Sequence, residues 1–189
     1  MDFEDRHVVV TGGTGALGTA VVGRLLNSGA MCHVPNINAS ELTNYSHRED
    51  ARVRLIGGVD LTSEQAVNQF YDELPELWAS IHLAGGFAMA SIADTDAAAF
   101  TDQIDMNALT CFLCCRAAVR RIRNSIVSRE VSSNGGRLDG GRIVNVAARP
   151  ALEPRIGDGM VAYTAAKAAV AAITQSLAEE LAGENIWVN

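Results

Sequence analysis

The chain has 189 residues, of which 48% are hydrophobic and 20% charged, and its net charge is −7. These values are typical of one globular domain that buries a core without disulfides or metal, and the acidic balance argues against a nucleic-acid partner. No apolar run approaches the ~20 residues of a membrane span, and the acidic start at residues 1–6 is unlike a secretion signal or a transit peptide, so we expect a cytoplasmic protein of one domain, 1–189, with no membrane partner.

The first predicted strand and helix enclose a glycine-rich turn. A β-branched run at 7–10 predicts a buried strand, and the apolar spacing at 20–26 predicts a helix. The turn consists of Thr11, Gly12, Gly13, Thr14, Gly15, Ala16, Leu17 and Gly18. Glycines there let the backbone approach a pyrophosphate, whose charge is met by free N–H groups and the helix dipole. Such turns also occur without a ligand, and the strand–helix context is what favours a dinucleotide site.

Strand and helix patterns alternate from the turn to the end of the chain. We predict strands at 8–11, 31–34, 53–57, 80–84 and 142–146, with a last one beginning at 186. Helices are predicted at 17–28, 63–71, 100–123 and 161–182. This alternation predicts an α/β fold with a doubly wound parallel sheet, a Rossmann fold in three layers, α/β/α.

Residues 124–141 interrupt the pattern. They are rich in Ser, Gly and Arg and connect a predicted helix to a predicted strand. Connections in such folds usually have about 2–6 residues. We therefore predict a surface loop insertion here, which would be a lid, a partner contact or tolerated decoration.

The cysteines raise the question of a metal. Cys111 and Cys114 form a C-x-x-C pair on the predicted helix 100–123, beside Cys115. A structural zinc site needs a second pair of ligands at suitable spacing, which the sequence does not offer. We therefore expect no metal, and thiols that pack as small apolar side chains in a reducing compartment.

Tyr163 and Lys167 lie four residues apart on the last predicted helix. Residues at this spacing project from one helix face, so both can point into one cleft. A phenol alone is too weak an acid to exchange protons near neutrality, and a nearby ammonium favours its phenolate form. The pair by itself would also suit a surface helix. Together with the glycine turn, it predicts a proton-transfer site beside a dinucleotide.

In sequence order, the glycine turn, Asp60, Asn107, Tyr163 and Lys167 form a pattern that resembles the short-chain dehydrogenase/reductase family. The resemblance covers residues 1–189 and implies NAD or NADP as cofactor, with hydride transfer at a carbonyl or alcohol. It implies that Tyr163 donates or accepts the proton, that Lys167 activates it and holds the ribose, and that Asn107 orders a relay water. The cofactor-binding residues that it implies are Gly12, Thr14, Gly15, Ala16, Leu17, Gly18, Asp60, Leu61, Ala84, Gly85, Gly86, Tyr163 and Lys167.

One departure from the family pattern concerns catalysis. Ala147 and Ala148 occupy the place of the family's substrate-binding serine and carry no hydroxyl. Losing one such donor costs roughly 10²–10³ in rate, so turnover could persist on a polarised substrate. Dihydropteridine reductase, a family member with a quinonoid substrate, also lacks this serine and resembles this chain at 84–86. A quinonoid small molecule therefore joins the candidate substrates.

Two further departures concern the cofactor and the end of the chain. The strand at 31–34 ends without the acid that would bind the ribose of NAD or the base that would bind the phosphate of NADP. Glu41 is the nearest acid and lies further along the loop, and His33 is the nearest base, so the choice stays open. The family continues beyond Asn189 through a substrate-binding segment, so we expect the sheet to lack its last strand and the substrate to stay unidentified.

Two functions fit this pattern. The first is an NAD(P)-dependent oxidoreductase, which the retention of Asn107, Tyr163 and Lys167 favours. The second is a catalytically weak or inactive cofactor-binding relative, a sensor or a scaffold subunit. The alanine-rich segments 107–123 and 163–182 also predict a homodimer or homotetramer, because small side chains permit close helix approach and the family pairs these helices in a four-helix bundle.

Overall fold

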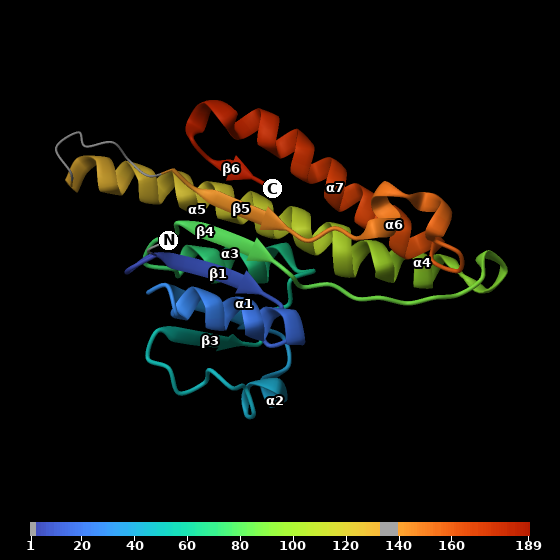
Figure 1. The fold of residues 1–189 in the computed structure, drawn as a ribbon, viewed down its shortest axis with the longest axis horizontal. Helices are drawn as coiled ribbons and strands as arrows, with labels where there is room; N and C mark the ends of the chain where they lie inside the picture. The colour runs from blue at the N-terminus through green and yellow to red at the C-terminus, as the bar shows by residue number, and fades with distance from the viewer. Residues whose placement is uncertain (1–2, 133–139) are drawn as a thin grey trace.

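The computed structural model describes residues 3–132 and 140–189, and these form a single twisted sheet with helices packed against it (Figure 1). The strands pair in parallel in the order β3-β2-β1-β4-β5-β6. The strands are β1 (His7–Thr11), β2 (Met31–Asn36), β3 (Val53–Gly57), β4 (Ala79–His82), β5 (Arg142–Asn145) and β6 (Trp187–Val188). The winding direction reverses between β1 and β4, which confirms the predicted doubly wound fold.

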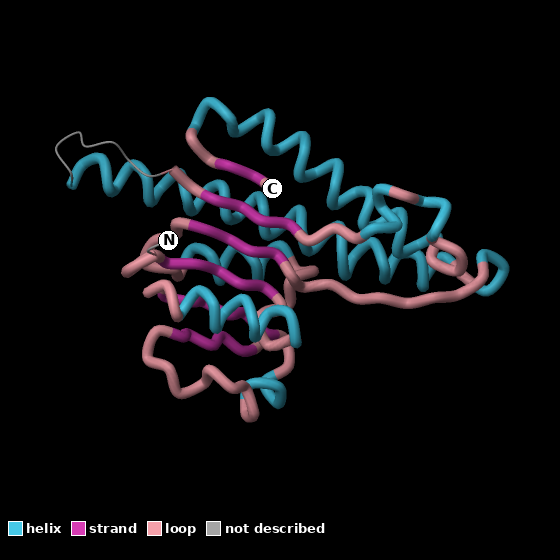
Figure 2. Tube along the Cα trace, in the orientation of Figure 1, coloured by secondary structure: helices cyan, strands magenta, loops and turns pink. Residues whose placement is uncertain are grey.

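The helices lie on both faces of the sheet (Figure 2). They are α1 (Ala16–Leu26), α2 (Ala39–Leu42), α3 (Glu64–Asp72), α4 (Ala97–Ile104), α5 (Thr110–Ser132), α6 (Arg149–Leu152) and α7 (Val161–Leu181). Short 3-10 turns are η1 (Ile92–Asp94), η3 (Pro154–Ile156) and η4 (Ala182–Glu184), and η2 (Asp105–Leu109) is a π-helical turn. Within the described ranges, none of the helices combines the length and the apolar composition of a membrane span.

Alternate side chains of β1 serve two separate cores. Val8 and Val10 pack with Val22 of α1, whereas Val9 packs with α3, α5 and α7 through residues such as Ile122 and Val170. All three valines are fully buried. This period of two on a strand covered on both faces is what produces the three layers.

The helix predicted at 100–123 begins earlier and is not uniform. Asp96 caps the start of α4, because its Oδ1 accepts from the N–H of Ala99 at 2.8 Å. The wide turn η2 then separates α4 from α5. Residues 105–109 contain neither Gly nor Pro, the residues that usually mark a break in a helix, so the sequence pattern did not reveal this turn.

The loop predicted at 124–141 is wrong over its first half. Helix α5 continues to Ser132, nine residues into that segment, and 133–139 lie outside the described residues. The helix continues because Ile122 and Ser125 face the core, where Ser125 Oγ accepts from the N–H of Leu77 at 2.9 Å. The first helix-breaking pair, Gly135-Gly136, comes later.

Candidate active site

The glycine turn closes tightly between β1 and α1. Gly12 has φ +65°, and a Cβ there would lie 2.7 Å from the backbone nitrogen of Ala84. A Cβ on Gly18 would lie 2.1 Å from the carbonyl oxygen of Gly12, so only glycine fits at either position. Helix α1 starts after Gly15 with no side-chain cap, which leaves its first N–H groups for an anion. This cradle fits a pyrophosphate.

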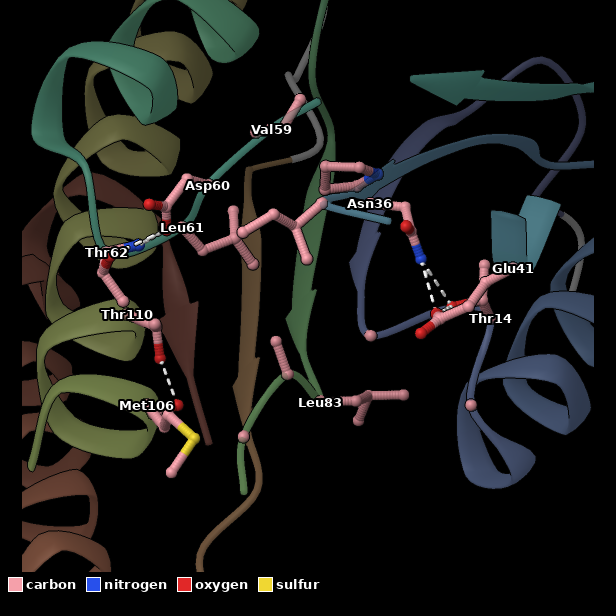
Figure 3. A pocket seen from close by; sticks show the side chains of 16 residues that line it. Thr14, Asn36, Glu41, Val59, Asp60, Leu61, Thr62, Leu83, Met106 and Thr110 are labelled. Atoms are coloured by element: carbon pink, nitrogen blue, oxygen red, sulfur yellow. Dashed lines mark hydrogen bonds between the residues drawn. The ribbon is translucent and has the colours of Figure 1, made fainter. Parts of the chain in front are cut away.

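Beside the turn lies a cavity of about 400 Å³ at the carboxyl ends of the central strands (Figure 3). This is the edge at which doubly wound sheets hold ligands. The cavity is lined by Gly12, Thr14, Gly15, Pro35, Asn36, Ile37, Glu41, Val59, Asp60, Leu61, Thr62, Leu83, Ala84, Gly85, Met106 and Thr110. The charged groups among these lining residues are Glu41 and Asp60, both acidic.

Three polar side chains form hydrogen bonds with one another at the α1–α2 end of the cavity. Asn36 Nδ2 donates to Glu41 Oε2 and to Thr14 Oγ1, each at 2.9 Å, and Thr14 Oγ1 donates to Glu41 Oε2 at 3.1 Å (Figure 3). Helix α2, which the sequence did not predict, brings Glu41 back to the end of β2. The carboxylate is therefore fixed in the cavity wall.

Asp60 lies on the opposite side of the cavity, after β3. Its Oδ1 accepts from the N–H of Thr62 at 2.9 Å and from Thr62 Oγ1 at 2.7 Å (Figure 3). The carbonyl of Asn36 anchors the preceding Val59 by accepting from its N–H at 3.1 Å. These bonds orient the Asp60 carboxylate at the cavity edge.

Asn107 lies in η2 and is 1% exposed. Its Nδ2 donates to the carbonyls of Gly86 and Gln103, both at 3.0 Å. In the part of the chain that the structure describes, its Oδ1 is buried without a hydrogen-bond partner. Buried acceptors are normally satisfied, so Oδ1 is placed to accept from a water or a ligand.

Tyr163 and Lys167 lie together on α7. Lys167 Nζ is 6.0 Å from the centre of the Tyr163 ring and donates to the carbonyl of Val146 at 2.9 Å. The Tyr163 ring also contacts the Phe87 ring in a T-shaped arrangement, with ring centres 4.9 Å apart. A Cβ on Gly85 would lie 2.6 Å from Asn107 Oδ1 and 3.5 Å from Lys167 Nζ. Gly85 therefore lies between the cavity, which it lines, and the residues expected to be catalytic.

Burial changes the electrostatics around Lys167. The side chain is 8% exposed, and desolvation lowers the pKa of its ammonium. Cys111 lies nearby, and a hydrogen bond from Cys115 lowers the pKa of its thiol to about 5, with a further contribution from His82. As a thiolate, Cys111 would in turn favour the charged form of Lys167.

The structure brings together most of the residues expected to bind cofactor, but not all. Six of them are not among the residues that line the cavity: Ala16, Leu17, Gly18, Gly86, Tyr163 and Lys167. Leu17 is 57% exposed on α1. The cavity is also lined by residues that were not expected in the site: Pro35, Asn36, Ile37, Glu41, Val59, Thr62, Leu83, Met106 and Thr110. A local signal for Asn36 was its place at the carboxyl end of β2.

The loop after β5 carries no hydroxyl. Ala147 packs partly against the larger core, and Ala148 is the N-cap residue of α6 without a side-chain hydrogen bond. Helix α6, which the sequence did not predict, turns the chain back towards α7. The position of the family serine is thus filled by small apolar side chains.

Comparisons with known proteins agree with this geometry. A family model described as short chain dehydrogenase matches residues 6–189. A PIGF/3-ketodihydrosphingosine reductase fusion protein of Schizosaccharomyces pombe is 30% identical over 187 residues, which are 95% of this chain and 35% of that protein. The NAD-dependent glycerol dehydrogenase of Listeria innocua is 27% identical over 192 residues, which are 100% of this chain and 69% of that enzyme.

Solved structures share the fold. NAD⁺-bound xylitol dehydrogenase superposes with a TM-score of 0.85 at 26% identity, covering 100% of this chain and 70% of that one. A short-chain type dehydrogenase/reductase from Mycobacterium ulcerans superposes with a TM-score of 0.84 at 23% identity, covering 100% of this chain and 67% of that one.

Proposed function

The chain belongs to the short-chain dehydrogenase/reductase family, and on this premise we propose that it transfers a hydride between NAD(P) and a small carbonyl, alcohol or quinonoid compound. One observation carries the proposal. Gly85 lines the cavity beside the glycine cradle and also abuts Asn107 and Lys167, so a dinucleotide in the cavity would reach the tyrosine–lysine pair.

The bound nicotinamide would supply or take the hydride. During reduction, Tyr163 gives its hydroxyl proton to the substrate oxygen as the substrate carbon gains the hydride. The Lys167 ammonium, held by Val146 O, stabilises the phenolate that remains. Asn107 Oδ1, an acceptor without a partner among the described residues, holds the water through which the proton is restored. With alanine at 147 and 148, polarisation of the carbonyl must come largely from the substrate.

We further infer that NAD is preferred to NADP. Glu41 can accept hydrogen bonds from ribose hydroxyls, as an acid at the end of the second strand does in dinucleotide-binding folds. The phosphate of NADP would meet this carboxylate, and no Lys, Arg or His is among the lining residues that the structure describes. Two relatives differ in this respect, since one is named NAD-dependent and another, an Arabidopsis thaliana aldehyde reductase, NADPH-dependent.

The reaction is tested by following NADH and NADPH absorbance with a panel of aldehydes, ketones and quinones. We expect cofactor consumption that Tyr163→Phe abolishes. Tyr45→Phe is the matched control, because Tyr45 is buried under α1 and its hydroxyl has no partner among the described residues. Cofactor binding by thermal shift without consumption would favour the binding-only alternative. Equal rates for wild type and Tyr163→Phe would contradict the mechanism.

We also propose a homodimer or homotetramer through α5 and α7. Both helices carry exposed apolar side chains, among them Phe112 of α5, 48% exposed, and Val161 of α7, 49% exposed. Burying such side chains against a second copy of the chain would favour association. Light scattering should give a mass at least twice that of the chain, and a monomer at micromolar concentration would exclude the proposal. Cytoplasmic location stays an expectation from the sequence.

A further inference from the structure

A buried cluster of one imidazole and two thiols lies behind the wall of the cavity. It consists of His82 at the end of β4 with Cys111 and Cys115 of α5, and their ligand atoms all lie within 4.8 Å of one another. The side chains are 5%, 4% and 2% exposed. Cys111 directly follows Thr110, which lines the cavity. We propose that this cluster is a binding site for a thiophilic divalent metal ion, with Zn²⁺ as the preferred ion.

One pair of ligand atoms already has the separation found around tetrahedral zinc. With Zn–S near 2.3 Å and Zn–N near 2.0 Å, ligand atoms stand roughly 3.5–3.8 Å apart. Cys115 Sγ and His82 Nδ1 are 3.5 Å apart. Two thiolates and an imidazole form a donor set that zinc favours over magnesium or calcium. The two thiolates also balance the charge of the ion in a dry interior.

The imidazole is already held as a metal ligand requires. His82 Nε2 lies 2.8 Å from Ser80 Oγ, and Tyr71 OH lies 2.8 Å from the same oxygen. Metal-bound histidines almost always donate their second ring nitrogen to such a partner, which fixes the ring. Nδ1 is thereby directed at the thiols.

Asn145 supplies a fourth, oxygen ligand. Its Oδ1 lies 2.8 Å from His82 Nδ1 and 3.4 Å from Cys115 Sγ. The amide cannot turn, because its Nδ2 donates to Thr174 Oγ1 at 2.9 Å, and that hydroxyl donates to Val170 O at 2.7 Å. Without metal, Asn145 Oδ1 can only accept a hydrogen bond from His82 Nδ1, so this nitrogen carries the imidazole proton.

Metal binding then has a defined proton balance. The two thiols lose their protons, and the proton of the neutral imidazole moves from Nδ1 to Nε2, which then donates a hydrogen bond to Ser80 Oγ. Each Zn²⁺ therefore releases two protons when both thiols start protonated, and binding weakens as the pH falls. The proposal does not depend on the oxidoreductase reaction, because these four residues lie outside the proposed proton path.

The C-x-x-C spacing in the sequence and the proposed site involve different pairs of cysteines. Cys111 and Cys114 have the C-x-x-C spacing, but Cys114 faces Tyr71 and the larger core, while Cys115 approaches Cys111 and His82. The expectation of a metal-free chain rested on the missing second pair, whereas the proposed site takes its histidine from β4, some thirty residues upstream. This arrangement also provides a matched control cysteine next to the cluster.

The decisive experiment uses the double variant Cys32→Ser/Cys114→Ser, which keeps every cluster residue and no other cysteine. Chelator-treated wild type and double variant are titrated with Co²⁺ and then with Zn²⁺. We expect one equivalent of Co²⁺ with thiolate-to-cobalt charge-transfer absorption in both proteins, displaced by one equivalent of Zn²⁺. Zn²⁺ should also raise the Tm of both.

Variants that remove a ligand complete the test. Cys111→Ser and Cys115→Ser should weaken Co²⁺ binding by at least about 100-fold, since changes to outer-shell partners alone cost ~10–100-fold. Absence of thiolate-to-cobalt absorption in the wild type and the folded double variant would overturn the proposal, and so would stoichiometric binding that survives in both single variants. Because the double variant leaves the cluster intact, misfolding of a ligand variant does not decide the outcome.

Discussion

Replacement of Glu41 by glutamine should remove the discrimination between NAD and NADP. The carboxylate is fixed in the cavity wall by hydrogen bonds of 2.9 Å from Asn36 and 3.1 Å from Thr14. Two unit charges 4 Å apart repel by about 1 kcal/mol even at the dielectric constant of water. A phosphate with nearly two charges would therefore lose about 2 kcal/mol beside Glu41, or about 30-fold in affinity.

The assay is the Kd of each reduced cofactor, measured by fluorescence titration or calorimetry. Wild type should bind NADH more tightly than NADPH, and Glu41→Gln should lower the ratio of the two constants by about tenfold or more, with weaker NADH binding. Glu49→Gln removes the same charge from a side chain that is 94% exposed and outside the cavity wall, and should leave the ratio unchanged. A wild type that prefers NADPH, or a ratio that Glu41→Gln does not alter, would refute the reasoning.

Three further changes test the fold around the site. Gly18→Ala should lower the free energy of unfolding by about 1–3 kcal/mol and weaken NADH binding, because the added Cβ would collide with Gly12 O. Gly183→Ala is the control, since a Cβ added there would meet no atom of the described residues within 4 Å. Urea unfolding should show no effect of this second change. Burial lowers the pKa of His33 to about 4 in the folded protein. As the pH falls, His33 is therefore protonated in the unfolded chain first, and the free energy of unfolding should fall by about 2 kcal/mol between pH 7 and pH 5. His33→Asn should largely flatten that slope, and an unchanged slope would contradict the assignment. Asp96→Ala should lower the free energy of unfolding by about 1 kcal/mol because it removes the N-cap of α4, whereas asparagine at this position should keep the cap. Equal melting temperatures for Asp96→Ala and Asp96→Asn would show that the cap does not contribute to stability.

The sequence predicted the layered fold because its strands are short β-branched runs and its helices are long and periodic. β3 was predicted with the bounds that the structure shows, and α7 within one residue. Helices α2 and α6 were missed because four residues are too few to establish a helical period. The end of α5 was misplaced because polar residues on its exposed side resemble loop composition.

The candidate site could be predicted from the sequence where its residues lie close together along the chain. The glycine turn and the Tyr163–Lys167 pair each lie within one segment, and spacing reveals them. Glu41 and His82 could not be assigned from spacing, since they meet their partners only through the sheet: Glu41 meets Thr14 across 27 positions, and His82 meets Cys115 across 33. Long-range contacts of this kind depend on strand order, which periodicity does not encode.

The wide turn η2 also constrains which length changes this chain can accept. A regular α-helix advances about 100° per residue, so one residue more or fewer rotates everything that follows by that angle. Deleting a residue within 105–109 would turn buried side chains of α5, such as Leu113 and Ala117, towards water and bring Phe112 towards the core. Related chains are therefore expected to conserve the residue count of η2 together with Asn107, and to gain or lose residues beyond Ser132 instead.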